Sequence, residues 1–279
     1  MKALIAQLLS AAEDSFWDLN NQFVRLGPPA RDAALSWLRS PNPLHRERAC
    51  HVLAEVQKRP IPRYPRPPHV WDIDHTPIPH LIRILENDPD KDVRCAAARA
   101  LKFQGEPQGL PALLRAAHTN DPDICYWVAM ELSIFNVYPE ELRPLLPTAH
   151  KIMLQLLNNP DENVRDWAAH AAQCDAFNIP AINAALWKLT KDVDGGVRGE
   201  ALSALAHHGD RRAIPNIRRA LFDSDTAIWS WLFEGIVKMQ AVELIPDLLA
   251  FGDEEARKAV QKLQKIASQR RASGVAPTV

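Results

Sequence analysis

Short amphipathic segments recur along the chain in a fixed order. An acidic or amide turn comes first, then a β-branched residue, then an Ala-rich run, as in NDPDKDVRCAAARAL (87–101) and KDVDGGVRGEALSAL (191–205). Apolar residues follow the β-branched one at steps of three or four and of eight, which is the period of one helix face. Each copy therefore predicts a helix whose N-cap is the Asp, Asn or Ser of the turn.

A second, shorter apolar segment comes before each copy. Most of these segments open with Ile-Pro or Leu-Pro, as in IPHLIRILE and IPNIRRAL, and proline is well tolerated in the first turn of a helix. One such helix pair cannot bury its apolar stripe, whereas stacked pairs can. We expect an all-α fold: a right-handed α-solenoid (α-α superhelix) of about seven helix pairs.

The repeats can be aligned on the residue after the β-branched position. This gives one position per repeat: Arg46, Arg94, Trp127, Arg165, Arg198, Trp229 and Arg257. The first spacing, 48 residues, exceeds the others, which run from 28 to 38. Residues 59–77, which are rich in proline and exclude a regular helix, account for the difference. We interpret them as an insertion between the first two repeats.

The two ends of the chain differ from the repeats. MKALIAQLLSAAED resembles a signal peptide, but its apolar run is short, is interrupted by Gln7, and keeps its helical period as far as Leu26. We expect 1–27 to be an N-terminal capping helix, 28–271 the solenoid and 272–279 a disordered tail.

DPDKDVRCAAARAL and VRGEALSALAHHGDRRAIPNIRRAL resemble HEAT repeats of the short bacterial type called PBS-lyase HEAT-like repeats. The resemblance covers about residues 28–270 and extends to a bacterial group of HEAT-repeat proteins with no established activity. It implies an architecture rather than a chemistry. It also implies that the recurring arginines form a structural ladder that pairs with turn carboxylates such as Asp88 or Asp192: Arg46, Arg94, Arg165 and Arg198. Trp127 and Trp229 then either fill packing gaps or offer flat binding surfaces.

In HEAT proteins the second helix of each pair lines the concave face. The outward positions implied by the alignment are Arg99, Glu131, Asp166, His170, Phe233 and Glu234. This mixture of charges and aromatic rings fits a protein-binding surface better than a groove for a polyanion. Asp166 and His170 lie one helical turn apart, an arrangement that can serve acid–base or metal chemistry, but the sequence shows no third partner at a suitable spacing.

The insertion carries two kinds of candidate. His69, Asp72, Asp74 and His75 are metal-ligand types, but their spacing matches no zinc pattern and no cysteine is nearby, so we expect no metal. Proline-rich segments can also act as docking elements. The insertion's candidate partner-binding residues are Arg63, Tyr64, Arg66 and Trp71, and we expect Tyr64 and Trp71 to anchor the segment on the solenoid.

Composition excludes several classes of function. The net charge of −1 gives no general attraction to nucleic acid or to an anionic membrane, and no apolar run approaches the ~20 residues of a membrane span.

The four cysteines form no C-x-x-C pair, which favours reduced thiols in a cytoplasmic protein. No phosphate-binding loop or hydrolase motif is present, so we expect no cofactor. The basic residues of the last helix fit the polar outer face of a terminal repeat or, alternatively, a binding patch.

The leading hypothesis is a non-enzymatic scaffold or adaptor whose partner is another protein, with an inhibitor or immunity-type protein as a special case. A HEAT-like DNA glycosylase is the enzyme alternative, because the resemblance would then assign Trp127, Trp167, Asp166 and Arg165 to its concave site. Such an enzyme needs a basic groove to bind phosphates, and this chain is not basic. A bilin-lyase-type subunit follows from the name of the repeat alone.

Overall fold

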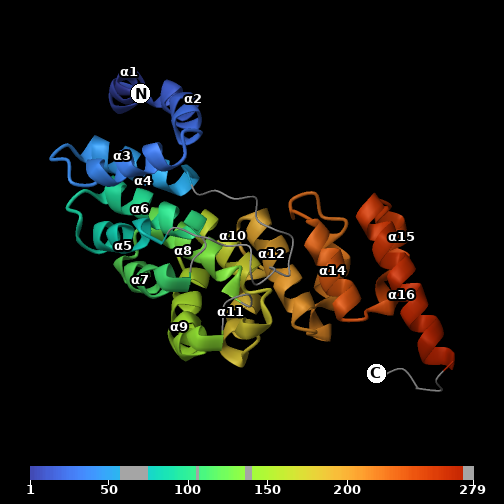
Figure 1. The fold of residues 1–279 in the computed structure, drawn as a ribbon. Coiled ribbons are helices and arrows are strands. Elements are labelled where there is room, and N and C mark those ends of the chain that lie inside the picture. The colour runs from blue at the N-terminus through green and yellow to red at the C-terminus, as the bar shows by residue number, and fades with distance from the viewer. Residues whose placement is uncertain (57–74, 105–106, 136–139, 273–279) are drawn as a thin grey trace. The chain divides into compact units, whose positions relative to one another are not determined.

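A computed structural model of the chain describes residues 1–56, 75–104, 107–135 and 140–272 (Figure 1). Every regular element in these ranges is a helix, and they contain no strand. The expected all-α class and α-solenoid architecture are confirmed. The chain divides into two compact units, Met1–Glu131 (unit 1) and Leu132–Val279 (unit 2), whereas the sequence pattern indicates one run of repeats over 28–271.

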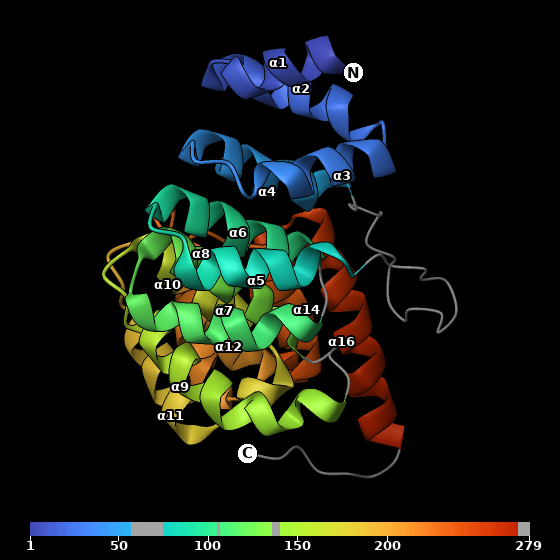
Figure 2. The same cartoon turned by 60° about the vertical axis from the view of Figure 1, so that its left-hand side comes forward.

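Unit 1 is a stack of helix pairs. Its helices are α1 (Lys2–Ser10), α2 (Glu13–Val24), α3 (Pro28–Trp37), α4 (Pro43–Val56), α5 (Pro77–Asn87), α6 (Lys91–Gln104), α7 (Leu110–Ala116) and α8 (Pro122–Leu132). Figure 2 shows α1–α2, α3–α4 and α5–α6 as successive layers. The second helices of neighbouring pairs, α2, α4 and α6, also pack on one another, so their side chains share one face of the unit.

Unit 2 repeats the same arrangement. Its helices are α9 (Leu146–Leu157), α10 (Glu162–Ala171), α11 (Pro180–Leu189), α12 (Gly195–His207), α13 (Ile214–Ala220), α14 (Ser230–Lys238), α15 (Ile245–Phe251) and α16 (Glu254–Ala272). The second helices α10, α12, α14 and α16 pack in that order. None of the described helices has the length and apolar character to cross a membrane.

The repeated turn explains why each second helix begins where it does. The carboxylate of Asp161 accepts the backbone N–H groups of Asn163 and Val164, and that of Asp194 accepts the N–H of Val197. These are N-cap bonds, which satisfy donors that the first helical turn leaves open. Val164 and Val197 are then buried, so the β-branched position of the sequence pattern points into the core.

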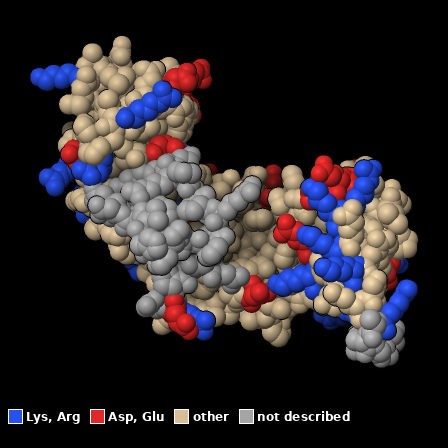
Figure 3. Space-filling model, turned by 45° about the vertical axis from the view of Figure 1, so that its right-hand side comes forward, with Lys and Arg blue, Asp and Glu red and all other residues tan. Residues whose placement is uncertain are grey.

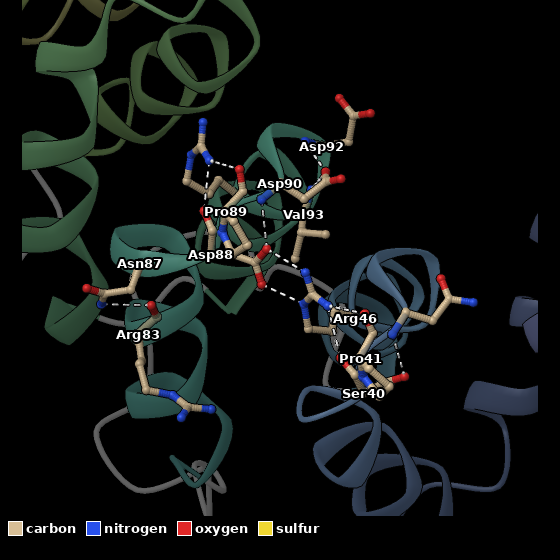
Figure 4. Close-up of polar contacts among 12 residues, drawn as sticks. Ser40, Pro41, Arg46, Arg83, Asn87, Asp88, Pro89, Asp90, Asp92 and Val93 are labelled. Carbon is tan, nitrogen blue, oxygen red and sulfur yellow. Dashed lines mark hydrogen bonds and ion pairs between the residues drawn. The ribbon is translucent and has the colours of Figure 1, made fainter.

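Arg46 joins two neighbouring repeats (Figure 4). Its Nη1 donates to the carbonyl oxygen of Ser40 in its own turn at 2.9 Å. Its Nε and Nη2 donate to the two carboxylate oxygens of Asp88 in the next turn at 2.7 and 2.8 Å. Burial alone would raise the pKa of Asp88, but the hydrogen bonds from Arg46 and from the Asp90 N–H hold it below its usual value. The turn is thus fixed by a buried ion pair.

The other ladder arginines make related contacts. Arg165 repeats the pattern of Arg46, with Nε and Nη2 donating to Asp192 at 2.8 and 2.9 Å and Nη1 to the carbonyl of Asn159. The Nη1 groups of Arg94 and Arg198 donate to the carbonyls of Asp88 and Asp192, each at a distance between 2.8 and 2.9 Å. Each of these arginines therefore contacts a turn carbonyl of its own repeat.

The two tryptophans assigned to the ladder lie elsewhere, and that part of the alignment is wrong. Asp121 accepts the N–H groups of Asp123 and Ile124 and so caps α8, which puts the buried Cys125 at the ladder position. Trp127 comes two residues later on the helix. Trp229 is the residue before α14 and has an extended backbone, with φ −103° and ψ 155°. In the third repeat the β-branched residue is Ile124, which precedes Cys125, so the alignment on Trp127 is two residues out of register.

The single capping helix expected for residues 1–27 is also wrong. Ala11 and Ala12 are extended, with ψ of 145° and 159°, so that α1 and α2 are separate helices. Arg48 of α4 explains the break, because its guanidinium donates to the carbonyl oxygens of Leu8 and Ala11. Acidic side chains at Glu13 and Asp14 then suit the start of a new helix.

The insertion and the tail fall mostly outside the described residues. Arg63, Tyr64, Arg66 and Trp71 all lie there, so the expectations for these four remain predictions. The segment predicted to be non-helical as far as residue 77 ends earlier, because α5 begins at Pro77, a position where proline fits a first turn. Ala272, the first residue of the expected tail, is instead the last residue of α16, and residues 273–279 lie outside the described residues.

Candidate functional site

A groove with a volume of about 500 Å³ opens along the second helices of unit 1. Its lining comes from α2, α4, α6 and α8. The residues are Glu13, Phe16, Trp17, Leu44, Glu47, Arg48, His51, Asp92, Cys95, Ala96, Arg99, Asp123 and Trp127. We call it the aromatic groove. It has the size of a site for a few amino-acid side chains or one small ligand.

Arg99 organises the aromatic part of this groove. Its guanidinium carbon lies 5.0 Å from the ring centroid of Trp17 and 5.9 Å from that of Trp127. The Arg99 Nη2 donates to Glu55 at 2.6 Å, and only 14% of the side chain is exposed. These contacts fix Arg99 and neutralise its charge, so it positions the two indoles as faces of a preformed site.

The rim of the groove is acidic. Glu13, Glu47, Asp92 and Asp123 all belong to the lining, and all but Glu47 are exposed. Both guanidiniums of the lining already have hydrogen-bond partners. Arg99 donates to Glu55, and Arg48 donates to the carbonyl oxygens at the end of α1. The carboxylates of the lining therefore outnumber its guanidiniums, which favours a cationic ligand over a phosphate.

Cys95 is the groove's one cysteine among the described lining residues. Burial raises the pKa of its thiol to about 11, although a hydrogen bond from Trp127 opposes the shift. The thiol is therefore protonated at neutral pH, and a thiol is a poor nucleophile. The Cys95 thiol therefore gives the groove no ready nucleophile.

Unit 2 holds a second group of polar and aromatic side chains. We call it the acid–tryptophan cluster: Asp166 and His170 on α10, Glu200 on α12, and Trp229 and Trp231 at the start of α14. The Oε2 atom of the buried Glu200 accepts a hydrogen bond from Trp231 Nε1 at 2.8 Å and lies 3.3 Å from His170 Nδ1. His170 packs edge-on against Trp231, with ring centroids 5.0 Å apart.

Asp166 is the residue of the cluster whose carboxyl pKa is raised. Burial, followed by the nearby carboxylates of Glu200 and Asp194, raises its pKa to about 6 from the ordinary 3.8, and His170 only partly opposes this. Gly196 packs beside it, since a Cβ there would lie 3.0 Å from Asp166 Oδ1. The ionised form of Asp166 is therefore unfavourable in the folded unit.

Replacing Asp166 with Asn is expected to stabilise unit 2 at pH 7.5. A raised carboxyl pKa means that folding favours the protonated form, so wild type loses stability as pH rises from about 4 through 6. Allowing for the partial exposure of the side chain, the gain for Asp166→Asn is about 1–2 kcal/mol at pH 7.5 and vanishes below pH 4. Urea unfolding at both pH values measures it. An equal effect at both pH values would show that Asp166 is not destabilised by ionisation.

The structure sorts the predicted site residues into three groups. Arg99 and Trp127 belong to the aromatic groove, and Asp166, His170 and Trp229 belong to the acid–tryptophan cluster. The expectation that Glu131 and Phe233 face outward is wrong, because they are 1% and 3% exposed. Glu131 lies 3.7 Å from the ammonium of Lys102, and Phe233 packs on Phe251.

Sequence reasoning missed several residues of both sites. Trp17 and Phe16 lie in the segment taken as a simple cap, and no repeat motif marks them. Arg48 and Glu200 sit at the same place relative to the N-cap as Trp127, six residues after it. An alignment on the caps instead of the β-branched residues would have found that shared position. In the described ranges, no group of three or more His, Cys, Asp or Glu side chains is arranged to hold a metal ion.

Comparison with protein families agrees with the repeated turn and its arginine. Residues 78–173 match HEAT repeats, and residues 197–223 match the PBS lyase HEAT-like repeat. This is a HEAT-repeat protein. A comparison with curated proteins gave no match.

Solved structures show the same fold as this HEAT-repeat protein. The YibA protein of Escherichia coli is 18% identical, with a TM-score of 0.68 over 94% of this chain and 92% of its own. An engineered protein is 22% identical, with a TM-score of 0.54 over 85% and 96%. A mutant of Kap121p is 15% identical, with a TM-score of 0.54 over 94% of this chain but 32% of Kap121p. At these identities the likeness concerns the fold alone.

Proposed function

We propose that this HEAT-repeat protein is a non-enzymatic scaffold that binds a basic segment of a partner protein in the aromatic groove of unit 1. The observation that carries the proposal is the combination of aromatic faces, preordered by Arg99, with an acidic rim. Four carboxylates face two guanidiniums in the lining, and both guanidiniums already have partners. An arginine or lysine side chain is the complement of such a site.

The aromatic faces add affinity that is independent of charge. Trp17 is 40% exposed, and it contacts Phe16 and His51 with ring centroids 5.0 Å away in both cases. Because its neighbours already hold the indole, a ligand that covers it gains apolar burial without ordering a loose side chain. Tryptophans in such settings are typical of the residues that dominate binding energies.

The same observations disfavour nucleic acid and catalysis. A polyanion needs several free cations to neutralise its phosphates, and the rim of the groove carries carboxylates instead. At the α15–α16 end of unit 2, Asp and Glu side chains lie beside the Lys and Arg side chains (Figure 3), and Lys258 pairs there with Glu254. The protonated Cys95 thiol gives the groove no nucleophile. The four cysteines are free thiols, which supports the cytoplasmic location inferred from the sequence.

Neutralising the rim is expected to weaken the binding of a basic peptide. The probe is a fluorescein-labelled peptide with two arginines and two leucines among Gly and Ser, compared with its citrulline analogue. Asp92 and Asp123 are exposed and lie in first helical turns. Asp92→Asn with Asp123→Asn should lower the affinity about tenfold, since each exposed ion contact contributes up to ~1 kcal/mol. Fluorescence anisotropy on the full chain measures this.

A matched pair of variants controls for net charge and helix stability. Asp14 and Glu162 are also exposed first-turn acids, but neither lines the groove. Asp14→Asn with Glu162→Gln should leave the affinity unchanged, and added salt should weaken the wild type more than the rim variant. Equal binding of the arginine and citrulline peptides, or equal losses in the two double variants, would contradict the proposal.

A further inference from the structure

We propose that the acid–tryptophan cluster of unit 2 is a separate binding site for one planar organic cation, the guanidinium group of an arginine side chain. The site would be formed by the carboxylate of Asp166 and the exposed face of Trp229, on a base made of Glu200, His170 and Trp231. This second site shares no residue with the aromatic groove of unit 1. The experiment that tests it is independent of the experiment that tests the groove.

The base of the cluster is held rigidly. The Oε2 atom of Glu200 accepts hydrogen bonds from Trp231 Nε1 and from Gln173 Nε2, both at 2.8 Å, and Glu200 is 3% exposed. His170 is wedged between Trp167 and Trp231, with ring centroids 5.4 and 5.0 Å away. A carboxylate and its aromatic neighbours thus keep their positions without a ligand, which lowers the entropic cost of binding one.

Two glycines bring the tryptophan segment onto this base. A Cβ at Gly195 or Gly199 would lie 1.9 Å from the backbone carbonyl oxygen of Asp225 or Ala227, respectively. The chain before α14 therefore lies directly on α12, which also carries Glu200. Trp229 follows at once, stacks on Trp231 with ring centroids 5.4 Å apart and planes 16° from parallel, and leaves 44% of its surface exposed.

The cluster lacks a cation. The carboxylates of Glu200 and Asp194 face Asp166 from α12 and from the turn before it, and His170 faces it from α10. Asp166 Oδ1 is buried and has no hydrogen-bond partner among the described residues. The ladder arginines of α10 and α12 already have hydrogen-bond partners: Arg165 donates to Asp192, and Arg198 donates to Thr226. An added positive charge would relieve the repulsion among these carboxylates.

The aromatic face selects the type of cation. A guanidinium is planar, stacks on an indole face, and is less strongly hydrated than the ammonium of lysine. It can donate to a carboxylate from its edge while its plane covers a ring. In this proposal Trp229 supplies the stacking face and Asp166 the carboxylate, so arginine fits the cluster better than lysine does.

The test uses N-acetyl-arginine amide as the probe and N-acetyl-citrulline amide as its neutral, isosteric control. Indole N–H resonances of the full chain are followed by NMR and assigned with Trp-to-Phe variants. The arginine compound should shift the Trp229 and Trp231 resonances in a saturable way, and the citrulline compound should not. Because Trp17 and Trp127 report separately on the groove, failure at one site does not affect the result at the other.

Variants then decide whether Asp166 supplies the charge. Asp166→Asn, which is expected to fold at least as well as wild type, should weaken arginine binding at least fivefold. Asp175→Asn, at an exposed acid of the same unit that pairs with Lys238, should leave it unchanged. Binding to wild type should tighten as pH rises from 5 to 7, since the raised pKa of Asp166 makes this carboxyl lose its proton over that range, and Asp166→Asn should reduce this dependence. Equal shifts with arginine and citrulline, or unchanged affinity in Asp166→Asn, would overturn the proposal.

Discussion

Alanine at position 199 is expected to destabilise unit 2 by about 3 kcal/mol or more. The added methyl group would lie 1.9 Å from the carbonyl oxygen of Ala227, and both partners are backbone, so neither can rotate away. Overpacking of this kind usually costs ~1–3 kcal/mol and more where backbone must move, which exceeds the gain of ~1 kcal/mol in helix propensity. The nearby bond from the Ala227 N–H to the Gly195 carbonyl, 3.1 Å long, would be strained as well.

Gly196→Ala is the matched control on the same helix. Its Cβ would meet only side-chain oxygens, of Asp166 and Asp194, at 3.0 Å, and a small movement relieves that contact. Urea unfolding followed by circular dichroism should show a large loss of stability for Gly199→Ala and a change within about 1 kcal/mol for Gly196→Ala. Similar losses for both would mean that the chain before α14 does not lie on α12 as described.

Removing the guanidinium of Arg165 is expected to cost about 3 kcal/mol. Arg165 and Asp192 form a bidentate pair whose side chains are 12% and 9% exposed. Burial would raise the pKa of Asp192, but Arg165 and the Asp194 N–H hold it below its usual value. Without the guanidinium, a buried carboxylate remains unpaired, and breaking such a pair costs ~3–5 kcal/mol when burial is complete. Unfolding of Arg165→Ala at pH 7 measures the loss.

A double-mutant cycle separates the pair from other effects of the substitution. Arg165→Ala and Asp192→Asn together should cost less than the sum of the two single changes, because each removes the other's partner. Arg218→Ala provides the surface control, since Arg218 is 49% exposed in its pair with Asp247 and exposed pairs contribute less than ~1 kcal/mol. Additive costs in the cycle would show that the ladder pair is not a structural link between repeats.

The sequence predicts the fold well because the fold depends on short-range patterns. Residues such as Asp161, Val164 and Arg165 encode a cap, a core position and a ladder contact within five positions, and this unit recurs along the chain. The break between α1 and α2 could not be predicted in this way. It depends on Arg48, which lies about forty residues beyond the carbonyls that it binds.

The candidate sites were only partly predictable for the same reason. Asp166 and His170 are visible as a pair one helical turn apart, but their partner Glu200 comes from the next repeat and 30 residues away from His170. Trp17 contributes to the groove through a helix that carries no repeat motif. Long-range pairs of this type are set by the stacking of helices, and a local pattern does not contain them.

A basic segment of a partner is proposed to lie in the aromatic groove of unit 1. The most direct measurement attaches a nitroxide label to the two-arginine peptide and follows the broadening of indole N–H resonances in the full chain. We expect the resonances of Trp17 and Trp127 to broaden strongly, whereas that of Trp187, which packs under Arg212 in unit 2, should stay sharp. Sharp resonances for Trp17 and Trp127 at saturating peptide would contradict the proposal.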